Sequence, residues 1–242
     1  MGAAGRHWHR HRGEGMSWFT DLTRSAVGKK AVMAVTGFIL FGFVLLHLVG
    51  NLKLYEGPRV LNAYAAFLRT VGEPALPESA LLWILRGVLI AAVALHLWAA
   101  WRLARLGNAA RPQGYAWPLR MHSRASYAAR TMRWGGVIIA LFVVYHLLHF
   151  TWGVVHPHFV AGDVYANVVT GFQVWWVSLF YIAAQVALGL HLYHGLWSFF
   201  QSLGWNHPRF NRWRDGFAHA FAWAITLGNI SFPVAVATGL VR

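Results

Sequence analysis

Long apolar runs alternate with short polar connections along most of this chain. A helix that crosses the hydrocarbon core of a bilayer needs about 20 predominantly apolar residues. The pattern therefore predicts an all-α fold, an integral membrane bundle of five transmembrane helices that forms one domain over residues 17–242. The five apolar runs are residues 31–52, 81–101, 134–155, 173–200 and 217–240.

The first 16 residues differ from the rest of the chain. They are rich in His and Arg and contain no apolar segment, so they do not have the form of a signal peptide. We expect residues 1–16 to be a disordered, solvated tail rather than a metal-binding segment. Met16 is an alternative start of translation, because the segment that it opens, MSWFTDL, has the form of a natural beginning.

Composition agrees with a membrane environment. Hydrophobic residues make up 57% of the chain and charged residues only 12%, whereas soluble domains carry roughly twice that charged fraction. Too few polar residues remain to cover a soluble protein of this length. The chain has no cysteine, which excludes disulfides, thiolate metal sites and cysteine-bound iron–sulfur clusters within it.

The net charge of +14 would by itself be compatible with a nucleic-acid partner. Almost all Lys and Arg, however, lie outside the five runs, and they concentrate before the first run, between the second and third, and between the fourth and fifth. The connection between the third and fourth runs has neither. By the positive-inside rule we expect a cytoplasmic N-terminus, an outer C-terminus and a multi-pass location in the cell inner membrane, with no nucleic acid bound.

Histidines are the ionisable residues that stand out inside the apolar runs. Ionisable side chains within a membrane are costly and usually functional. The first four runs carry His47, His96, His146 and His191, and none of these runs contains Asp or Glu. A proton relay would usually include a carboxylate, whereas neutral imidazole suits a metal ligand and above all haem iron.

The depths of these four histidines sort them into two levels. Counted along alternating helices at about 1.5 Å per residue, His47 and His146 fall in the outer half of the bilayer and His96 and His191 in the inner half. Two bis-histidine haems, one above the other, would need this arrangement. For a single histidine, a hydrogen bond between helices is the ordinary alternative.

Four segments resemble the cytochrome b membrane-anchor subunit of succinate dehydrogenase and fumarate reductase, in its single-subunit, five-helix, two-haem form. The resemblance extends over residues 17–242. The segments are SxVGKKxxMxxTG from Ser25, HLVGN from His47, MRWGGVIIALFVVYHLLHFTWG from Met132 and HLYHGLWSFFQSLGW from His191.

The resemblance implies two haem b groups, one held by His47 with His146 and the other by His96 with His191. It selects His191 over His194 because the family's ligand stands four residues before a glycine, here Gly195, which also leaves room for a flat macrocycle. His149 and His194 would hydrogen-bond a propionate or quinone, with a plain packing role as the alternative. Lys29 and Lys30 would pair with inner propionates or partner carboxylates, with contact to lipid headgroups as the alternative.

The resemblance also implies a flavoprotein subunit with FAD and an iron–sulfur subunit, both docked on the cytoplasmic face. The chain itself would not act on succinate but would pass electrons between the iron–sulfur partner and a quinone, expected to be menaquinone, within the lipid bilayer. Some fumarate reductases of this family carry a Glu two residues before the fourth ligand. Gly189 stands there in this chain, which favours succinate oxidation.

Two places are candidates for the quinone. The outer one has Glu73 and Glu78 before the second run, and we favour Glu73 as the proton carrier because Glu78 fits the cap of a helix start. The inner one has Trp18, Ser25 and Trp205. Other readings of the whole chain stay open: the dihaem cytochrome b of another quinone-linked dehydrogenase or hydrogenase, or a haem-free anchor or transporter.

Overall fold

A computed structural model describes residues 24–110, 124–205 and 207–242, and side chains are described in all of these except 124–131. The described residues form helices and connections without a β-strand. Five helices are long: α2 (Ala26–Asn51), α4 (Ala80–Ala109), α5 (Arg124–His146), α7 (Trp175–Ser202) and α8 (Pro208–Ala237). Four are short: the 3-10 helix η1 (Leu52–Glu56), α3 (Pro58–Thr70), the π-helical turn η2 (Leu147–Thr151) and α6 (Val164–Gln173).

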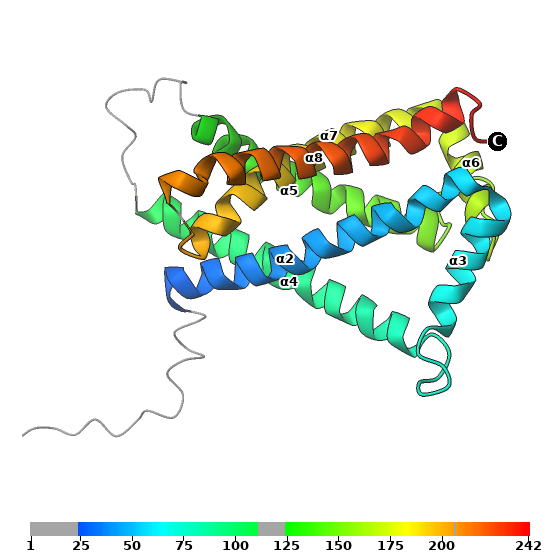
Figure 1. Cartoon of the computed structure of the whole chain (residues 1–242), viewed down its shortest axis with the longest axis horizontal. Coiled ribbons are helices and arrows are strands. Elements are labelled where there is room, and N and C mark those ends of the chain that lie inside the picture. Colours follow the sequence, from blue (N-terminus) through cyan, green and yellow to red (C-terminus); the bar gives the residue numbers. More distant parts are fainter. Residues whose placement is uncertain (1–23, 111–123, 206) are drawn as a thin grey trace, which may run out of the picture.

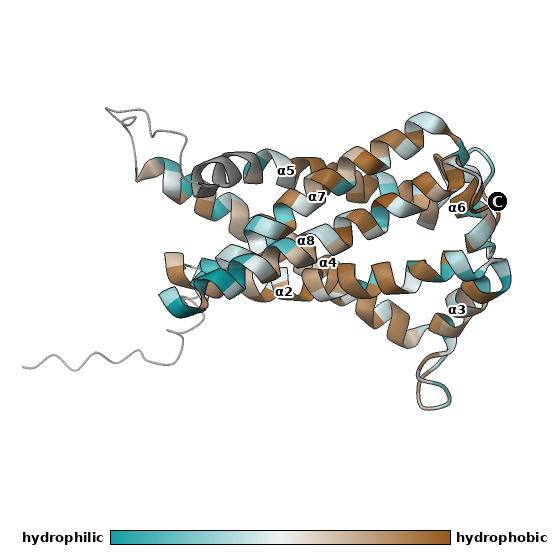
Figure 2. Cartoon of the chain, turned by 45° about the horizontal axis from the view of Figure 1, so that its top comes forward, coloured by the Kyte–Doolittle hydropathy of each residue, from teal (hydrophilic) through white to brown (hydrophobic). Residues whose placement is uncertain are grey.

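The prediction of five membrane-spanning helices is confirmed. The helical segments long and apolar enough to cross a bilayer are Ala26–Glu56, Ala80–Ala109, Met132–Thr151, Trp175–Ser202 and Pro208–Ala237. Their exterior is apolar: Leu46, Ile90 and Trp175 expose 70%, 71% and 75% of their surfaces. Figure 2 shows the hydrophobic residues along the helices and the hydrophilic ones gathered toward the ends. The chain is a multi-pass, all-α membrane protein.

The expected bounds of the spans differ from the helices at several ends. Two helices begin well before the expected run: α5 begins at Arg124 rather than at 134, and α8 begins at Pro208 rather than at 217. Pro at the first helical position and His207, whose side chain accepts a hydrogen bond from the backbone N–H of Arg209, start this helix. Its first turns are polar, so they extend the helix beyond the apolar run.

Consecutive long helices run in opposite directions (Figure 1). We call the end of the bundle where α2 begins the N-terminal end, and the end that holds the C-terminus the C-terminal end. The most extensive packing joins α7 to α8, α2 to α4 and α5 to α7, and α2 also meets α7 and α8. Five spans thus place the start of α2 and the end of α8 at opposite ends.

Short helices close the C-terminal end. The helices α3 and α6 pack against each other there, and α6 also packs against α7 and α8. The side chain of Asn62 joins them, since its Nδ2 donates to Asp163 Oδ1 at 2.9 Å and its Oδ1 accepts from the backbone N–H of Tyr165 at 3.0 Å. Much of the buried apolar core, including Leu54 and Val169, lies at this end.

Candidate functional site: two histidine pairs

The four predicted ligands meet in two pairs. His47 on α2 and His146 at the end of α5 have ring centroids 5.9 Å apart, with the rings perpendicular. His96 on α4 and His191 on α7 have centroids 6.4 Å apart, with the rings inclined by 62°. We call them the first pair and the second pair. Each pair draws one histidine from each of two helices, in the combination that depth along the helices predicts.

The pairs lie at two separate levels. Thr36 marks the level of the second pair on α2, because its hydroxyl contacts His96, and its separation from His47 corresponds to roughly 16 Å of helix rise. Gly136 marks the same level on α5, because a Cβ there would lie 3.7 Å from His191 Cε1, and its separation from His146 corresponds to roughly 15 Å. Two helices therefore give the same spacing.

Hydrogen bonding selects the proton position on one histidine of the second pair. The hydroxyl of Thr36 has one proton, which it donates to the carbonyl of Val32 at 2.7 Å. Its oxygen is then an acceptor for His96 Nδ1, 3.1 Å away. A proton on Nδ1 leaves the Nε2 lone pair of His96 available to a metal, which is the usual arrangement around a ligating histidine.

Tyr181 contacts the first pair as Thr36 contacts the second. Its hydroxyl lies 3.4 Å from His146 Nδ1 and 3.1 Å from His149 Nδ1. One hydroxyl can accept from one imidazole while it donates to the other. An accepted proton from His146 keeps the Nε2 lone pair of that ring free. His149 is then protonated on Nε2, a buried atom with no hydrogen-bond partner among the described residues.

The ring spacing of both pairs and the surroundings of the second pair fit a haem. Two imidazoles on opposite sides of one metal, with metal–nitrogen bonds of about 2 Å, have centroids roughly 6 Å apart. Glycines lie where a flat macrocycle needs space: a Cβ on Gly37 would stand 3.5 Å from His96 Cε1, and one on Gly195 would meet only Met132 Cε, at 3.9 Å. His191 Nδ1 is buried without a hydrogen-bond partner in the described part of the chain, a costly state unless another group binds.

The described residues contain no cluster of three or more His, Cys, Asp or Glu side chains that could hold a bare metal ion. A pair of imidazoles alone makes a weak site for a free ion with four or more coordination positions. It suits a metal whose other ligands come from a macrocycle. The donor set therefore points to haem rather than to a free transition-metal ion.

Several predicted accessory residues have structural surroundings of their own. Lys29 is fully buried, and its Nζ donates to the backbone carbonyls of Arg24 at 2.6 Å and Ser25 at 3.3 Å. Lys30 is exposed, and His194 is half-buried on α7. A cofactor role of these residues stays a prediction, while Lys29 also satisfies carbonyls at the start of α2.

The quinone candidates are spread over both ends. Glu73 is exposed in the connection between α3 and α4, which projects from the bundle in Figure 1. Ser25 caps α2 by accepting from the backbone N–H of Gly28 at 2.9 Å. Trp205 is exposed and stacks on Phe200, and Trp18 lies outside the described residues. In the described part of the chain, Glu73, Ser25 and Trp205 do not share a cluster with a histidine pair.

Two charged residues, on α8 and α4, were not singled out from the sequence. Asp215 on α8 accepts a hydrogen bond from the Tyr193 hydroxyl at 2.9 Å, and His219 stacks on the Tyr193 ring. Arg86 lies in the first two turns of α4, where its guanidinium stacks over Trp83 at 4.7 Å. A lone cation near the end of an apolar run was the available signal for Arg86, and ordinary snorkelling explains such a residue equally well.

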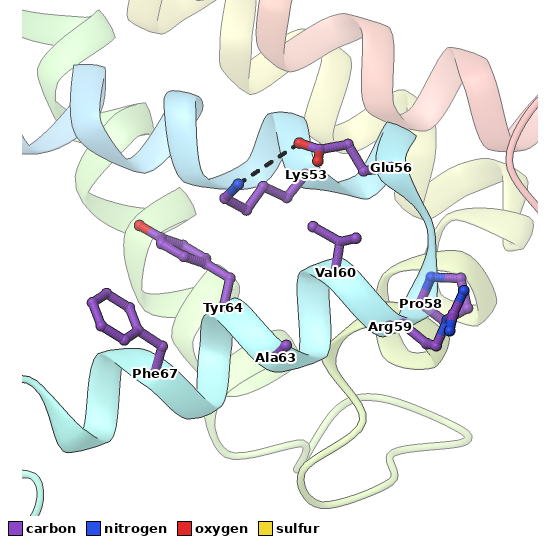
Figure 3. Close-up of a pocket in the computed structure, with 8 residues that line it drawn as sticks. All are labelled: Lys53, Glu56, Pro58, Arg59, Val60, Ala63, Tyr64 and Phe67. Carbon is purple, nitrogen blue, oxygen red and sulfur yellow. Dashed lines mark ion pairs between the residues drawn. The ribbon is translucent and has the colours of Figure 1, made fainter.

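A hollow of about 700 Å³ lies between η1 and α3 at the C-terminal end (Figure 3). Lys53 lines it, with its Nζ 3.7 Å from Glu56 Oε1 and 5.5 Å from the centroid of the Tyr64 ring. The cation thus already has a carboxylate and an aromatic face as neighbours. Arg59 also lines the hollow, so its lining keeps one cation beyond the ion pair of Lys53 with Glu56.

Comparisons of the chain with protein-family models, curated proteins and solved structures found no match.

Proposed function

We propose that this chain is the membrane-anchor cytochrome b of a succinate:quinone oxidoreductase, with one haem b at each histidine pair. The observation that carries the proposal is the meeting of four histidines from four spans as two pairs at two levels. Isolated histidines that only bridge helices would have no reason to sort in this way. The resemblance of the four sequence segments supplies the identity of the complex.

Haem iron, when bound, supplies one-electron transfer. The chain's own residues fix the two rings of each pair and orient one ring of each by a hydrogen bond, through Thr36 for His96 and Tyr181 for His146. The helices exclude water from both levels because their outer faces are apolar. Electrons would cross the membrane thickness between the second pair, nearer the N-terminal end, and the first pair.

The distribution of cations supports a cytoplasmic N-terminal end in the cell inner membrane. Arg102, Arg105, Arg133, Arg209 and Arg212 lie on helix ends at that side of the bundle. We propose that the iron–sulfur subunit, with its FAD-containing flavoprotein, docks on this face. Quinone, expected to be menaquinone, would exchange electrons with the chain, and succinate would bind only to the partner subunits.

The first test is a redox spectrum of the purified chain together with its haem content. A b-type spectrum with two haems per chain is expected. A chain without haem would contradict the proposal and favour a plain anchor or transporter.

Variants of the four histidines test which two of them hold the same haem. His47→Ala and His146→Ala should each remove the same haem, and His96→Ala and His191→Ala the other, because a bis-histidine site loses its ligand field with either partner. His158→Ala, an exposed histidine in the connection after η2, is the matched control and should keep both. Loss of one haem in His194→Ala but not in His191→Ala would contradict the assignment of the fourth ligand.

Partner identity distinguishes the related complexes. Co-purification from the native membrane should yield a flavoprotein and an iron–sulfur protein, with succinate-dependent reduction of both haems. A hydrogenase or formate dehydrogenase as partner would keep the two haems and replace the succinate reaction.

A further inference from the structure

A second cavity, of about 210 Å³, lies at the C-terminal end where four elements meet. Its wall includes Arg69 from the end of α3, Arg86 from α4, Phe150 and Thr151 from η2, and Asn167 from α6. The backbone N–H of Ser79 donates to the carbonyl of Arg69 at 2.6 Å, which closes the connection between α3 and α4. This closure brings the two arginines, distant in sequence, to one cavity.

The charge of this cavity is unbalanced. Both arginines are exposed at it, and no Asp or Glu is among its lining residues in the described part of the chain. Asn167 offers no charge, and its amide is already used in two hydrogen bonds with the backbone of Val160, both at 2.7 Å. Arg86 is also a cation within a membrane-spanning helix, where an unpaired charge is costly. The cavity therefore suits a ligand with two negative charges.

The cavity adjoins the first histidine pair. The ring of Phe150, part of its wall, has its centroid 5.8 Å from that of His146. Arg86 lies roughly 9 Å along α4 from the C-terminal end of the bundle, and His47 lies roughly 6 Å from the end of α2, so the two stand at similar depth. Phe150 therefore lies in the wall of the cavity and also against one ring of the pair.

We propose that Arg69 and Arg86 bind the two propionates of the haem held by His47 and His146, an inference that rests on the proposed function. The two propionates of a haem leave from one edge of the macrocycle, so they present two carboxylates close together. Guanidinium groups bind carboxylates through two parallel hydrogen bonds. The stacking of Arg86 on Trp83 fixes the plane of its guanidinium before the carboxylate arrives.

The matched control lies on the same helix. Arg105 stacks over Trp101 at 5.0 Å, as Arg86 stacks over Trp83, but at the opposite end of α4. Arg69→Gln, Arg86→Gln and Arg105→Gln are compared as purified protein with both haems, in a spectroelectrochemical titration. The two haem signals are assigned through the His47→Ala and His96→Ala variants.

A cation near a haem stabilises the reduced form, which carries one more electron. Arg69→Gln and Arg86→Gln should each lower the reduced-to-oxidised ratio of the first-pair haem by about tenfold at a fixed potential. This change corresponds to a midpoint potential that is about 59 mV lower for a one-electron couple. The second-pair haem should change little. Arg105→Gln should leave the first-pair haem unchanged.

A second readout reports the propionates themselves. Redox-difference infrared spectra of protein with ¹³C-labelled propionates should show shifted carboxylate bands in Arg86→Gln. Arg86→Lys should also shift these bands, because lysine keeps the charge but not the planar pair of donors. Unchanged potentials and bands in the arginine variants, with both haems bound, would overturn this assignment alone. Loss of a bound anionic phospholipid in Arg86→Gln, without shifts in potential or carboxylate bands, would assign the cavity to a lipid headgroup and would also overturn the propionate assignment. A wild-type chain without haem would overturn both the proposed function and the propionate assignment.

Discussion

Replacement of Gly189 by alanine tests a close approach of α7 to α8. A Cβ at this position would overlap Thr226 Oγ1 and lie 3.3 Å from Thr226 Cβ. Thr226 is buried, and its hydroxyl donates to the carbonyl of Ala222 at 2.7 Å, so it has little freedom to move aside. The two helices must therefore separate or Thr226 must break its hydrogen bond.

The expected cost follows from two opposing terms. Overpacking of a well-packed contact costs about 1–3 kcal/mol. Alanine in place of glycine within a helix returns up to about 1 kcal/mol. A net loss of about 1–2 kcal/mol is expected, which lowers Tm by roughly 2–8 °C for a protein of this size. Gly216→Ala, on α8 with no neighbour within 4 Å, is the control and should not lower Tm.

The assay is thermal unfolding of purified protein in detergent, followed by helical circular dichroism. Thr226→Ala removes the overlapping oxygen, so the double variant should recover most of the Tm lost by Gly189→Ala. A Tm for Gly189→Ala equal to that of Gly216→Ala would refute the close approach. So would a double variant that is no more stable than the single one.

The same contact bears on position 189 as a site for a carboxylate. Glutamate is larger than alanine, so Gly189→Glu should lower Tm further unless Thr226 is shortened. Introduction of an acidic residue at position 189 therefore requires a change on α8 as well as on α7.

Three further predictions concern other parts of the chain. Under the proposed function, Thr36→Val removes the acceptor for His96 Nδ1, so a haem at the second pair should be lost about 10- to 100-fold more readily on detergent titration while one at the first pair is retained. Hydrogen bonds from the Ala166 N–H and the Asn62 amide lower the pKa of Asp163, so its stabilisation is full above the ordinary Asp pKa and is lost as pH falls through the lowered value. Asp163→Asn should accordingly lower Tm at neutral pH, and the difference from wild type should vanish in acid. Glu73→Gln should slow quinone reduction with both haems present, whereas normal turnover, together with damage in Ser25→Ala, would place quinone at the inner site.

The number of spans and the sorting of the histidines were predictable from the sequence because both depend on helix rise and on long apolar runs. The short helices α3 and α6 were not predicted, because neither is long enough to register as an apolar run. The polar start of α8 was missed for a related reason: its first turns carry Arg209, Arg212 and Asp215, so hydropathy places the boundary too late.

The surroundings of the histidines were also beyond the sequence. The shared hydroxyl of Tyr181, on α7, and the contact of Thr36 with His96 join residues that no spacing relates. The approach of Arg69 to Arg86 depends on how the connection between α3 and α4 closes, which is a tertiary feature. Trp18 and residues 1–16 lie outside the described residues, so the expectations for them stay predictions.

The position of α4 has a consequence for how the protein is assembled in the membrane. This helix packs along α2 and touches α3, whereas its contacts with α5, α7 and α8 in the described residues are minor. In a membrane, apolar surface alone gives a helix no reason to leave lipid for a neighbour. Under the proposed function, a haem held by His96 and His191 would tie α4 to α7. Haem insertion would then be a step in the assembly of the protein. In the protein without haem, α4 would remain loosely packed, and quality-control proteases could recognise it as unassembled.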